Sequence, residues 1–175
     1  MKRILLIFAS FSVMFLLGCS DESSYQNFSP KNSGFVVSFS KSPQEKTYPD
    51  VASATNIKDF LVEDGNFAFL VNYRTLNDEI IKNQSESEIL AHLRNFGGVT
   101  NKSIVIYEND FKLQGKTAKD IIYRSQTGGQ QRVRLVLNKN RVFAIIVSAI
   151  GADLKTDKKA LKFLSSFKLT DFAEK

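Results

Sequence analysis

The sequence is poor in the residues that form covalent, metal and nucleophilic sites: its 175 residues include one cysteine, one histidine and no tryptophan. One cysteine cannot form an internal disulfide, so the fold must be stabilised by its core. A zinc site uses three or four Cys, His or carboxylate ligands, and a hydrolase triad needs a histidine base beside its nucleophile. We therefore expect His92 to be a structural or surface residue, and we expect neither a metal nor a cofactor.

Paired carboxylates are the one pattern in the sequence that would suit an enzyme, because glycoside hydrolysis uses two of them. The pairs are Glu63-Asp64, Asp78-Glu79, and Glu86 with Glu88. All fall in expected turns or at a helix start, where turn chemistry and the helix dipole favour acids anyway. No catalytic residue is predicted. A cell-wall-directed hydrolase that uses an acidic pair is the alternative.

The only cysteine follows an apolar run at the N-terminus. Lys2 and Arg3 precede the run at residues 4–17, which is too short to span a membrane, since a spanning helix needs about 20 apolar residues. A basic start, an apolar centre and a small residue at the end are typical of an export signal. Leu16-Leu17-Gly18-Cys19 resembles the lipobox of bacterial lipoproteins, although Leu17 stands where a small residue is preferred.

This resemblance implies that residues 1–18 are removed and that Cys19 is the lipidated first residue of the mature chain. Two or more acyl chains, such as palmitate, hold a protein stably at a bilayer. Ser20 follows the cysteine. By the sorting rule of enteric bacteria it favours the periplasmic face of the outer membrane over the inner membrane in a host with two membranes. The alternative is an ordinary thiol after a signal of another type or after an uncleaved anchor.

Composition divides the rest of the chain into a tether and one domain. Residues 19–33 are polar, contain Pro30 and show no apolar periodicity, which predicts a flexible tether. Residues 34–170 suit a single domain, and residues 171–175 form a C-terminal tail. Removal of residues 1–18 lowers the net charge from +6 to +4. So mild an excess is typical of a solvated surface, and an exported protein is not expected to bind nucleic acid.

The apolar pattern predicts strands before and after a first helix. The expected strands cover residues 35–39, part of 54–62, 67–73, 104–113, 117–125, 131–138 and 141–150. A break is expected at Tyr48-Pro49-Asp50, between the first two. The strands at 67–73 and 141–150 are apolar on both faces, so both should be covered on both sides, and the second should be central. Ser85 and Glu88 match a capping box at the start of a helix over 85–96.

A closing helix is expected over residues 157–167. Its apolar positions predict that Leu161, Leu164 and Phe167 face the core. Lysines 155, 158, 159 and 162 should face water.

Two glycine or asparagine turns would fix the register of the last strands. Two-residue loops at Gly128-Gly129 and Lys139-Asn140 would place Tyr123 opposite Arg134, Ser125 opposite Arg132, and Leu135 opposite Ala144.

Tyr123, Arg132 and Arg134 would then share one sheet face with Lys119. Arginine forks bind carboxylates and phosphates, so these three residues are the candidate partner-binding site. The alternative is that the arginine stems pack under a helix or loop.

Several short phrases in the domain resemble the Mog1/PsbP-like family, in particular its small bacterial lipoproteins and DcrB-type periplasmic members. These phrases are Gly34-Phe35-Val36-Val37-Ser38-Phe39 with Pro43, Gly115-Lys116, Asn140-Arg141-Val142-Phe143, and Phe163-Leu164-Ser165-Ser166-Phe167-Lys168-Leu169. The resemblance implies an α+β fold. It is an α/β/α sandwich around a twisted antiparallel sheet of six to seven strands, with two main helices. It also implies accessory or binding proteins with no shared catalytic residue, and DcrB-like members suggest homodimers.

Together these observations predict a membrane-anchored envelope lipoprotein that acts as a non-enzymatic binding or accessory module. Its expected partners are the membrane, through the lipid on Cys19, and another envelope protein or a glycan. The sheet face or the loop edges would make the contact. A self-associating structural lipoprotein is the second alternative beside the hydrolase.

Overall fold

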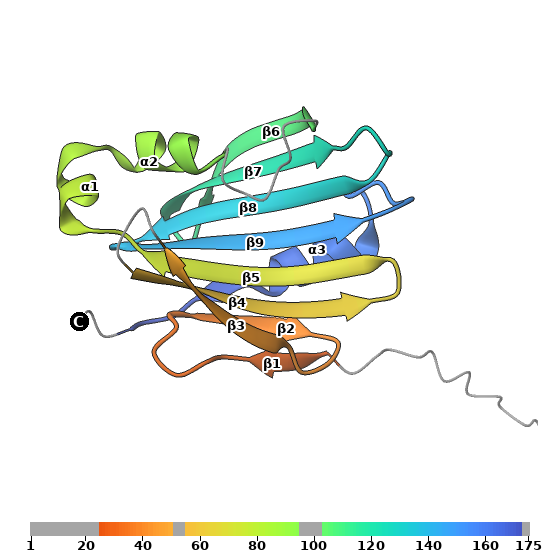
Figure 1. Ribbon diagram of the computed structural model, residues 1–175, viewed down its shortest axis with the longest axis horizontal. Coiled ribbons are helices and arrows are strands. Elements are labelled where there is room, and N and C mark those ends of the chain that lie inside the picture. Colours follow the sequence, from red (N-terminus) through yellow and green to blue (C-terminus); the bar gives the residue numbers. More distant parts are fainter. Residues whose placement is uncertain (1–24, 51–54, 95–102, 173–175) are drawn as a thin grey trace, which may run out of the picture.

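A computed structural model describes residues 25–50, 55–94 and 103–172. Cys19, the expected signal at 1–18 and Gly97-Gly98 lie outside these residues. Within them the chain forms a seven-stranded antiparallel sheet, a small three-stranded sheet and three helices (Figure 1). No helix in the described ranges is long and apolar enough to cross a membrane.

Alternating apolar residues build the large sheet, whose strand order is β3-β4-β5-β9-β8-β7-β6. The strands are β3 (Gln44–Asp50), β4 (Thr55–Asp64), β5 (Phe67–Thr75), β6 (Ile104–Leu113), β7 (Lys116–Arg124), β8 (Gln130–Asn138) and β9 (Arg141–Ala149). Strand β9 is the fourth of the seven, and Phe143, Ile145 and Val147 on one face and Val142, Ala144 and Ile146 on the other are buried. Its expected central place is confirmed.

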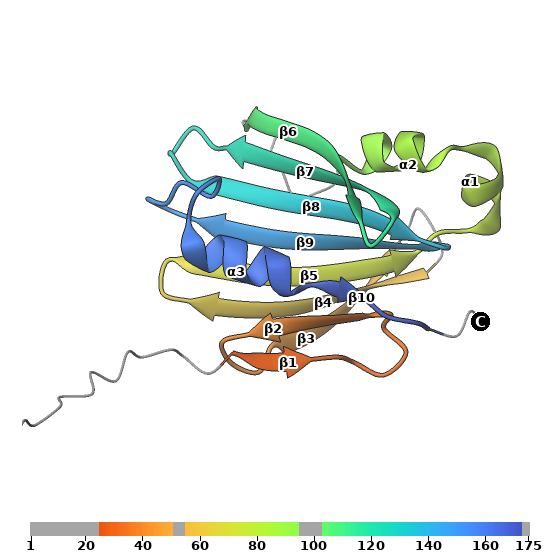
Figure 2. The same cartoon turned by 180° about the vertical axis from the view of Figure 1, so that it is seen from behind.

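One face of the large sheet carries a phenylalanine-rich core, covered by α3 (Lys158–Ser166) and by the small sheet (Figure 2). The small sheet has the order β1-β2-β10 and consists of β1 (Gln26–Phe28), β2 (Phe35–Phe39) and β10 (Lys168–Leu169). Phe35 of β2 stacks on Phe167 at 5.6 Å and packs edge-on against Phe143 at 6.0 Å. We call this face the α3 face.

The opposite face carries the helices α1 (Asp78–Asn83) and α2 (Glu86–Leu93). Ser85 and Glu88 form the expected capping box, and Ile89, Leu90 and Leu93 pack on β7 and β8. We call this face the α2 face; in the described part of the chain no helix covers β3, β4 and β5 on it (Figure 1). Strand β5 is therefore buried only on its α3 side; Ala68, Leu70 and Asn72 on the other side are half-buried, so the expected double coverage is wrong.

Both ends of the expected domain need correction. The tether was expected to reach residue 33, but β1 pairs with β2, and Phe28 packs against Phe39 and Phe60 at 5.8 and 5.1 Å. Residues 25–33 therefore belong to the domain. At the other end, Phe172 of the expected tail is buried.

Arg141 joins these two ends. Its guanidinium donates hydrogen bonds to the carbonyl oxygens of Asn32 and Ser33 at 2.8 and 2.7 Å, and it lies 4.0 Å from the ring centroid of Phe172. A Cβ at Gly34 would collide with the same ring, and Gly34 has φ +83, so this position requires glycine.

Three more expectations differ from the structure. The break at Tyr48-Pro49-Asp50 is part of β3, an edge strand, where proline costs no ladder hydrogen bond. The short helix α1 was not expected. In α3, which begins after the N-cap Asp157 as predicted, Ala160, Phe163 and Leu164 are buried whereas Leu161 is 38% exposed.

Candidate binding site

The expected site of Tyr123, Arg132 and Arg134 does not lie on one face. Residues 125–129 connect β7 to β8, closed by a hydrogen bond from the Ser125 N–H to the Gly129 carbonyl oxygen at 2.8 Å. This loop is longer than the expected Gly128-Gly129 turn by an odd number of residues, which reverses the faces of one strand. Tyr123 therefore pairs with Gln131. The pairing of Leu135 with Ala144 across the Lys139-Asn140 turn is confirmed.

The two arginines lie on the α3 face, where both bind Asp120. Arg132 donates to the two carboxylate oxygens of Asp120 at 2.9 and 2.8 Å, and Arg134 donates to Oδ2 at 3.0 Å. Burial raises the pKa of Asp120, but the hydrogen bonds from Arg132 and Arg134 outweigh it, and the net pKa lies below the ordinary 3.8. The carboxylate is thus ionised and shared between two cations.

The same arginines fasten α3 to the sheet. Arg132 donates to the carbonyl oxygen of Leu154 at 2.8 Å, just before the helix, and Arg134 donates to that of Leu164 at 3.0 Å, near its end. The Arg134 guanidinium also lies over the Phe111 ring at 4.9 Å. The arginine stems therefore pack under a helix, which was the alternative reading of the sequence.

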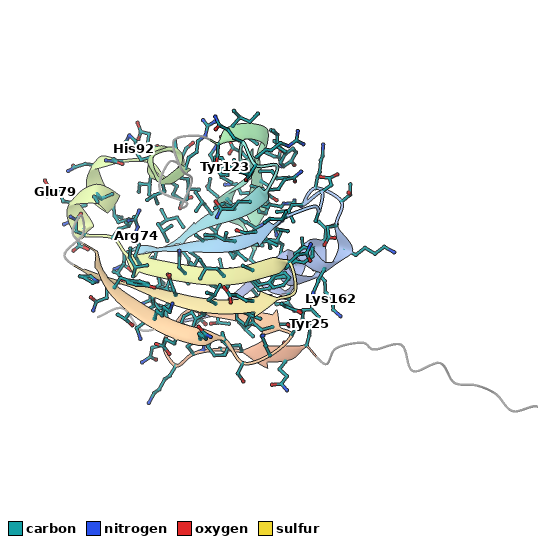
Figure 3. The ribbon with its side chains drawn as sticks, turned by 45° about the vertical axis from the view of Figure 1, so that its right-hand side comes forward. Tyr25, Arg74, Glu79, His92, Tyr123 and Lys162 are labelled. Atoms are coloured by element: carbon teal, nitrogen blue, oxygen red, sulfur yellow. The ribbon has the colours of Figure 1, made fainter. Side chains whose placement is uncertain are left out.

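Tyr123 lies on the α2 face and is 5% exposed. Its hydroxyl donates to the carbonyl oxygen of Arg94 at 2.7 Å, and burial raises its pKa. Lys119, on the same face, forms ion pairs with Glu108 and Asp110 at 2.9 and 2.7 Å. Figure 3 shows Tyr123 on the same side of the molecule as His92, away from Lys162.

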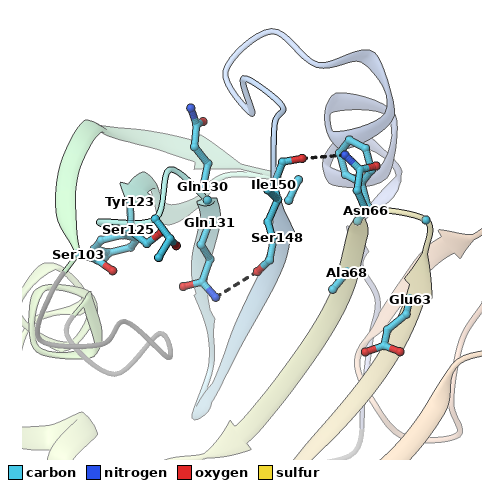
Figure 4. Close-up of a pocket in the computed structure, with 15 residues that line it drawn as sticks. Glu63, Asn66, Ala68, Ser103, Tyr123, Ser125, Gln130, Gln131, Ser148 and Ile150 are labelled. Atoms are coloured by element: carbon cyan, nitrogen blue, oxygen red, sulfur yellow. Dashed lines mark hydrogen bonds between the residues drawn. The ribbon is translucent and has the colours of Figure 1, made fainter.

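A pocket opens on the α2 face beyond the end of α2. One row of paired residues crosses the sheet there, and it consists of Val105, Tyr123, Gln131, Ser148, Ala68 and Glu63. The pocket has a volume of about 640 Å³, and its lining includes Asn66 and Thr127. Figure 4 shows how Asn66, Gln131 and Ser148 lie in it. It forms because small or polar side chains replace the large apolar residues of the neighbouring rows.

Amides and hydroxyls dominate the polar lining of this pocket. The Asn66 amide donates to the carbonyl oxygen of Ile150 at 2.8 Å, and the Gln131 amide donates to the Ser148 hydroxyl at 3.3 Å. Among the described residues that line the pocket, Glu63 is the one charged side chain. Such a surface can donate and accept hydrogen bonds with an uncharged polar ligand.

The acidic pairs do not converge on this pocket. Glu63 and Asp64 point to opposite faces of β4, and Asp64 accepts hydrogen bonds from Lys159 and Ser40, of which the first chiefly lowers its pKa. Glu88 is engaged in the capping box, and a hydrogen bond from the Ser85 backbone lowers its pKa as well. A general acid needs a raised pKa. Asp78 and Glu79 lie in the first turn of α1, where the helix dipole favours acids. The geometry therefore gives no support to a hydrolase built on any of the three pairs.

Metal binding has no support in the described ranges either, since they contain no group of three or more His, Cys, Asp or Glu residues able to hold an ion. The Nδ1 atom of His92 lies 3.2 Å from Oε1 of the Gln84 side chain on the surface, as expected of a surface histidine.

Sequence reasoning missed the pocket, although a signal was present. Gln131 and Ser148 interrupt the apolar alternation of β8 and β9 near one end of each strand. Antiparallel pairing places these two interruptions opposite each other. A correct register would have revealed a polar row in place of the arginine face.

Comparisons with known proteins identify the fold. No family model matches the chain, and no curated protein matches it. The solution structure of a cyanobacterial PsbP (CyanoP) from Synechocystis sp. PCC 6803 is similar, with a TM-score of 0.60, 11% identity and coverage of 87% of this chain and 96% of that chain. PA94 from Pseudomonas aeruginosa, a protein of unknown function, is similar with a TM-score of 0.50, 13% identity and coverage of 86% and 99%. The expected PsbP-like α+β fold is therefore confirmed.

Proposed function

We propose that this protein is a membrane-anchored, non-enzymatic accessory domain of the bacterial envelope, and that its pocket binds an extended segment of another envelope protein. The observation that carries the proposal is the row of Gln131, Ser148 and Ala68, whose polar or small side chains leave an open pocket on the α2 face. The lipobox-like Leu16-Leu17-Gly18-Cys19 supports the anchor. In a host with two membranes, Ser20 favours the outer membrane.

A polypeptide suits the pocket better than a glycan does. Its amides and hydroxyls match the hydrogen-bonding groups of an extended backbone. Apolar side chains flank them, since Ile150 is 73% exposed and Val105, on the edge strand β6, is 39% exposed. Sugar rings commonly need an open aromatic face, whereas the Tyr123 ring is buried. A glycan is therefore the second ligand class to be tested.

Site-specific photocrosslinking in the native host tests the pocket. A crosslinking amino acid at Ser148 should capture one defined envelope protein, whereas the same group at the exposed Ser165 on α3 should not capture it. Ala68→Trp, which fills the pocket, should abolish capture while the protein stays folded. Equal capture from both positions would contradict the proposed site. A sugar adduct would indicate a glycan ligand, and an adduct with a second copy would indicate self-association.

The anchor is tested separately by intact mass and detergent partitioning of the native protein beside a Cys19→Ala variant. The native chain should begin at Cys19, carry acyl mass and enter the detergent phase, because two or more acyl chains give stable membrane attachment. The variant should do neither. An unmodified native chain that stays in the aqueous phase would refute the anchor and leave the pocket test unaffected.

A further inference from the structure

We infer that the exposed side of α3 is a docking surface for anionic lipid headgroups of the membrane that holds the anchor. This inference rests on the proposed lipid anchor and adds the orientation of the domain on the bilayer. The surface consists of Lys158, Lys162 and Leu161, with Lys155 just before the helix.

The charge within helix α3 is of one sign. Helix α3 contains three lysines and no acidic residue. Lys159 is neutralised by Asp64 at 2.8 Å, whereas Lys155, Lys158 and Lys162 have no carboxylate within 4.0 Å in the described part of the chain. Leu161 is 38% exposed between them. Lysines around an exposed apolar side chain suit the surface of an anionic bilayer.

The chain enters the domain on this same surface. Tyr25, the first described residue, lies under the Lys162 ammonium, which is 4.2 Å from the Tyr25 ring centroid (Figure 3). Cys19 precedes Tyr25 by six residues. A fully extended chain of that length spans about 20 Å. Because β1 shortens the expected tether so strongly, a lipid on Cys19 would hold α3 close to the headgroups.

The opposite layer has the opposite charge. Residues 153–169, which include α3, carry five lysines and two aspartates, whereas residues 77–94, which include α1 and α2, carry four acidic and two basic side chains. An anionic bilayer attracts the first layer and repels the second. In this orientation the pocket on the α2 face points away from the membrane and stays open to a partner.

Vesicle sedimentation tests this surface without the anchor. The probe is the chain from residue 19 onward with Cys19→Ala, which keeps the whole described core and carries no lipid. It should sediment with vesicles containing phosphatidylglycerol and not with pure phosphatidylcholine vesicles, and salt should weaken the binding. K158E/K162E should bind at least about 25-fold more weakly, since each lysine near the surface contributes about five-fold.

The matched control is K46E/K82E, which changes the net charge equally but lies on exposed positions outside α3. Circular dichroism confirms that each variant is folded. The inference is overturned if the probe does not bind phosphatidylglycerol vesicles, or if both double variants lose binding equally. Because the probe carries no acyl group, neither result depends on whether Cys19 is lipidated.

Discussion

On the α3 face of the large sheet, α3 and β2 cover a continuous core of aromatic rings, whereas on the α2 face the helices cover only part of the sheet. Both faces belong to the same seven strands, so the difference comes from alternate residues of each strand. Along β5, Phe67, Phe69 and Val71 are buried, while Ala68 and Leu70 between them are half-buried. The α3 face therefore buries the larger cluster of side chains, and the α2 face holds the pocket.

The two faces also differ in how their buried carboxylates are paired. The Asp120 carboxylate on the α3 face is bound by two arginines, and its pKa is lowered. Asp59 on the α2 face has one buried oxygen without a hydrogen-bond partner, and burial raises its pKa against a weaker effect of Lys46. A fully paired carboxylate stabilises the α3 face, whereas a partly desolvated one weakens the α2 face.

Asp120→Ala should have the largest effect, a loss of about 3–5 kcal/mol in the free energy of unfolding, because it leaves two buried guanidinium groups without their counter-charge. Urea unfolding measures this loss. Asp110→Ala is the control. Asp110 pairs with Lys119 on the other face but is largely exposed, so its removal should cost about 1 kcal/mol or less. Equal losses of unfolding free energy in the two variants would mean that the carboxylate on the α3 face is no more important for stability than the one on the α2 face.

Neighbouring residues of β5 test the comparison directly. Phe69→Ala should destabilise the protein by about 3–5 kcal/mol, because Phe69 is buried in the aromatic core. Leu70→Ala should cost about 1 kcal/mol, since Leu70 is only partly buried. Thermal or urea unfolding of both variants gives the difference. If Leu70→Ala were as costly as Phe69→Ala, the α2 face would be a second full core.

Acid unfolding should depend on Asp120. Since its folded-state pKa lies below the unfolded value, its contribution is present above that value and is lost as the pH falls through the folded pKa. The native protein should therefore lose stability progressively below about pH 4. Asp120→Asn should be less stable at neutral pH and should show a flatter decline below pH 4. If stability declined just as steeply below pH 4 in Asp120→Asn, other carboxylates would be responsible for the loss of stability in acid.

Asp59→Asn should have the smallest effect on the free energy of unfolding, and it should stabilise the protein where the other substitutions destabilise it. Because the folded-state pKa of Asp59 is raised, the ionised carboxylate costs stability above that pKa, and protonation relieves the cost as the pH falls. At neutral pH the variant should be more stable than the native protein, by about 0.5 kcal/mol or less. Unfolding curves at neutral pH and at pH 4 measure the gain, which should shrink at the lower pH. A loss of stability at neutral pH would contradict this account.

The sequence predicted the elements whose signal is local and strong. Strand β6 has the predicted bounds, and β7, β8 and β9 differ from their predicted bounds by one residue at one or both ends. The capping box correctly places the start of α2. Strand β3 was missed because an edge strand needs no apolar face. Helix α1 was missed because it has no buried residue and therefore no apolar stripe.

The predicted site of Tyr123, Arg132 and Arg134 was wrong for a different reason, because the prediction depended on the length of one loop. All residues of β7 and β8 except the first of each were assigned to the correct strand, yet the longer connection at residues 125–129 moved Tyr123 to the face opposite Arg132 and Arg134. Local patterns fix which residues form a strand, whereas the register depends on turn geometry and long-range packing. A prediction that combines residues from two strands is therefore correct only if the length of the loop between them is predicted correctly.

The pairing of β2 with β10 has a consequence for the time at which the protein folds. Phe35 lies opposite Leu169, and the Thr170 N–H donates to the Gly34 carbonyl oxygen, so the small sheet closes only when nearly the whole chain is present. Contacts this distant in sequence form slowly. A chain still emerging from a ribosome cannot complete this sheet until residues 168–170 are available to pair with residues 34–36.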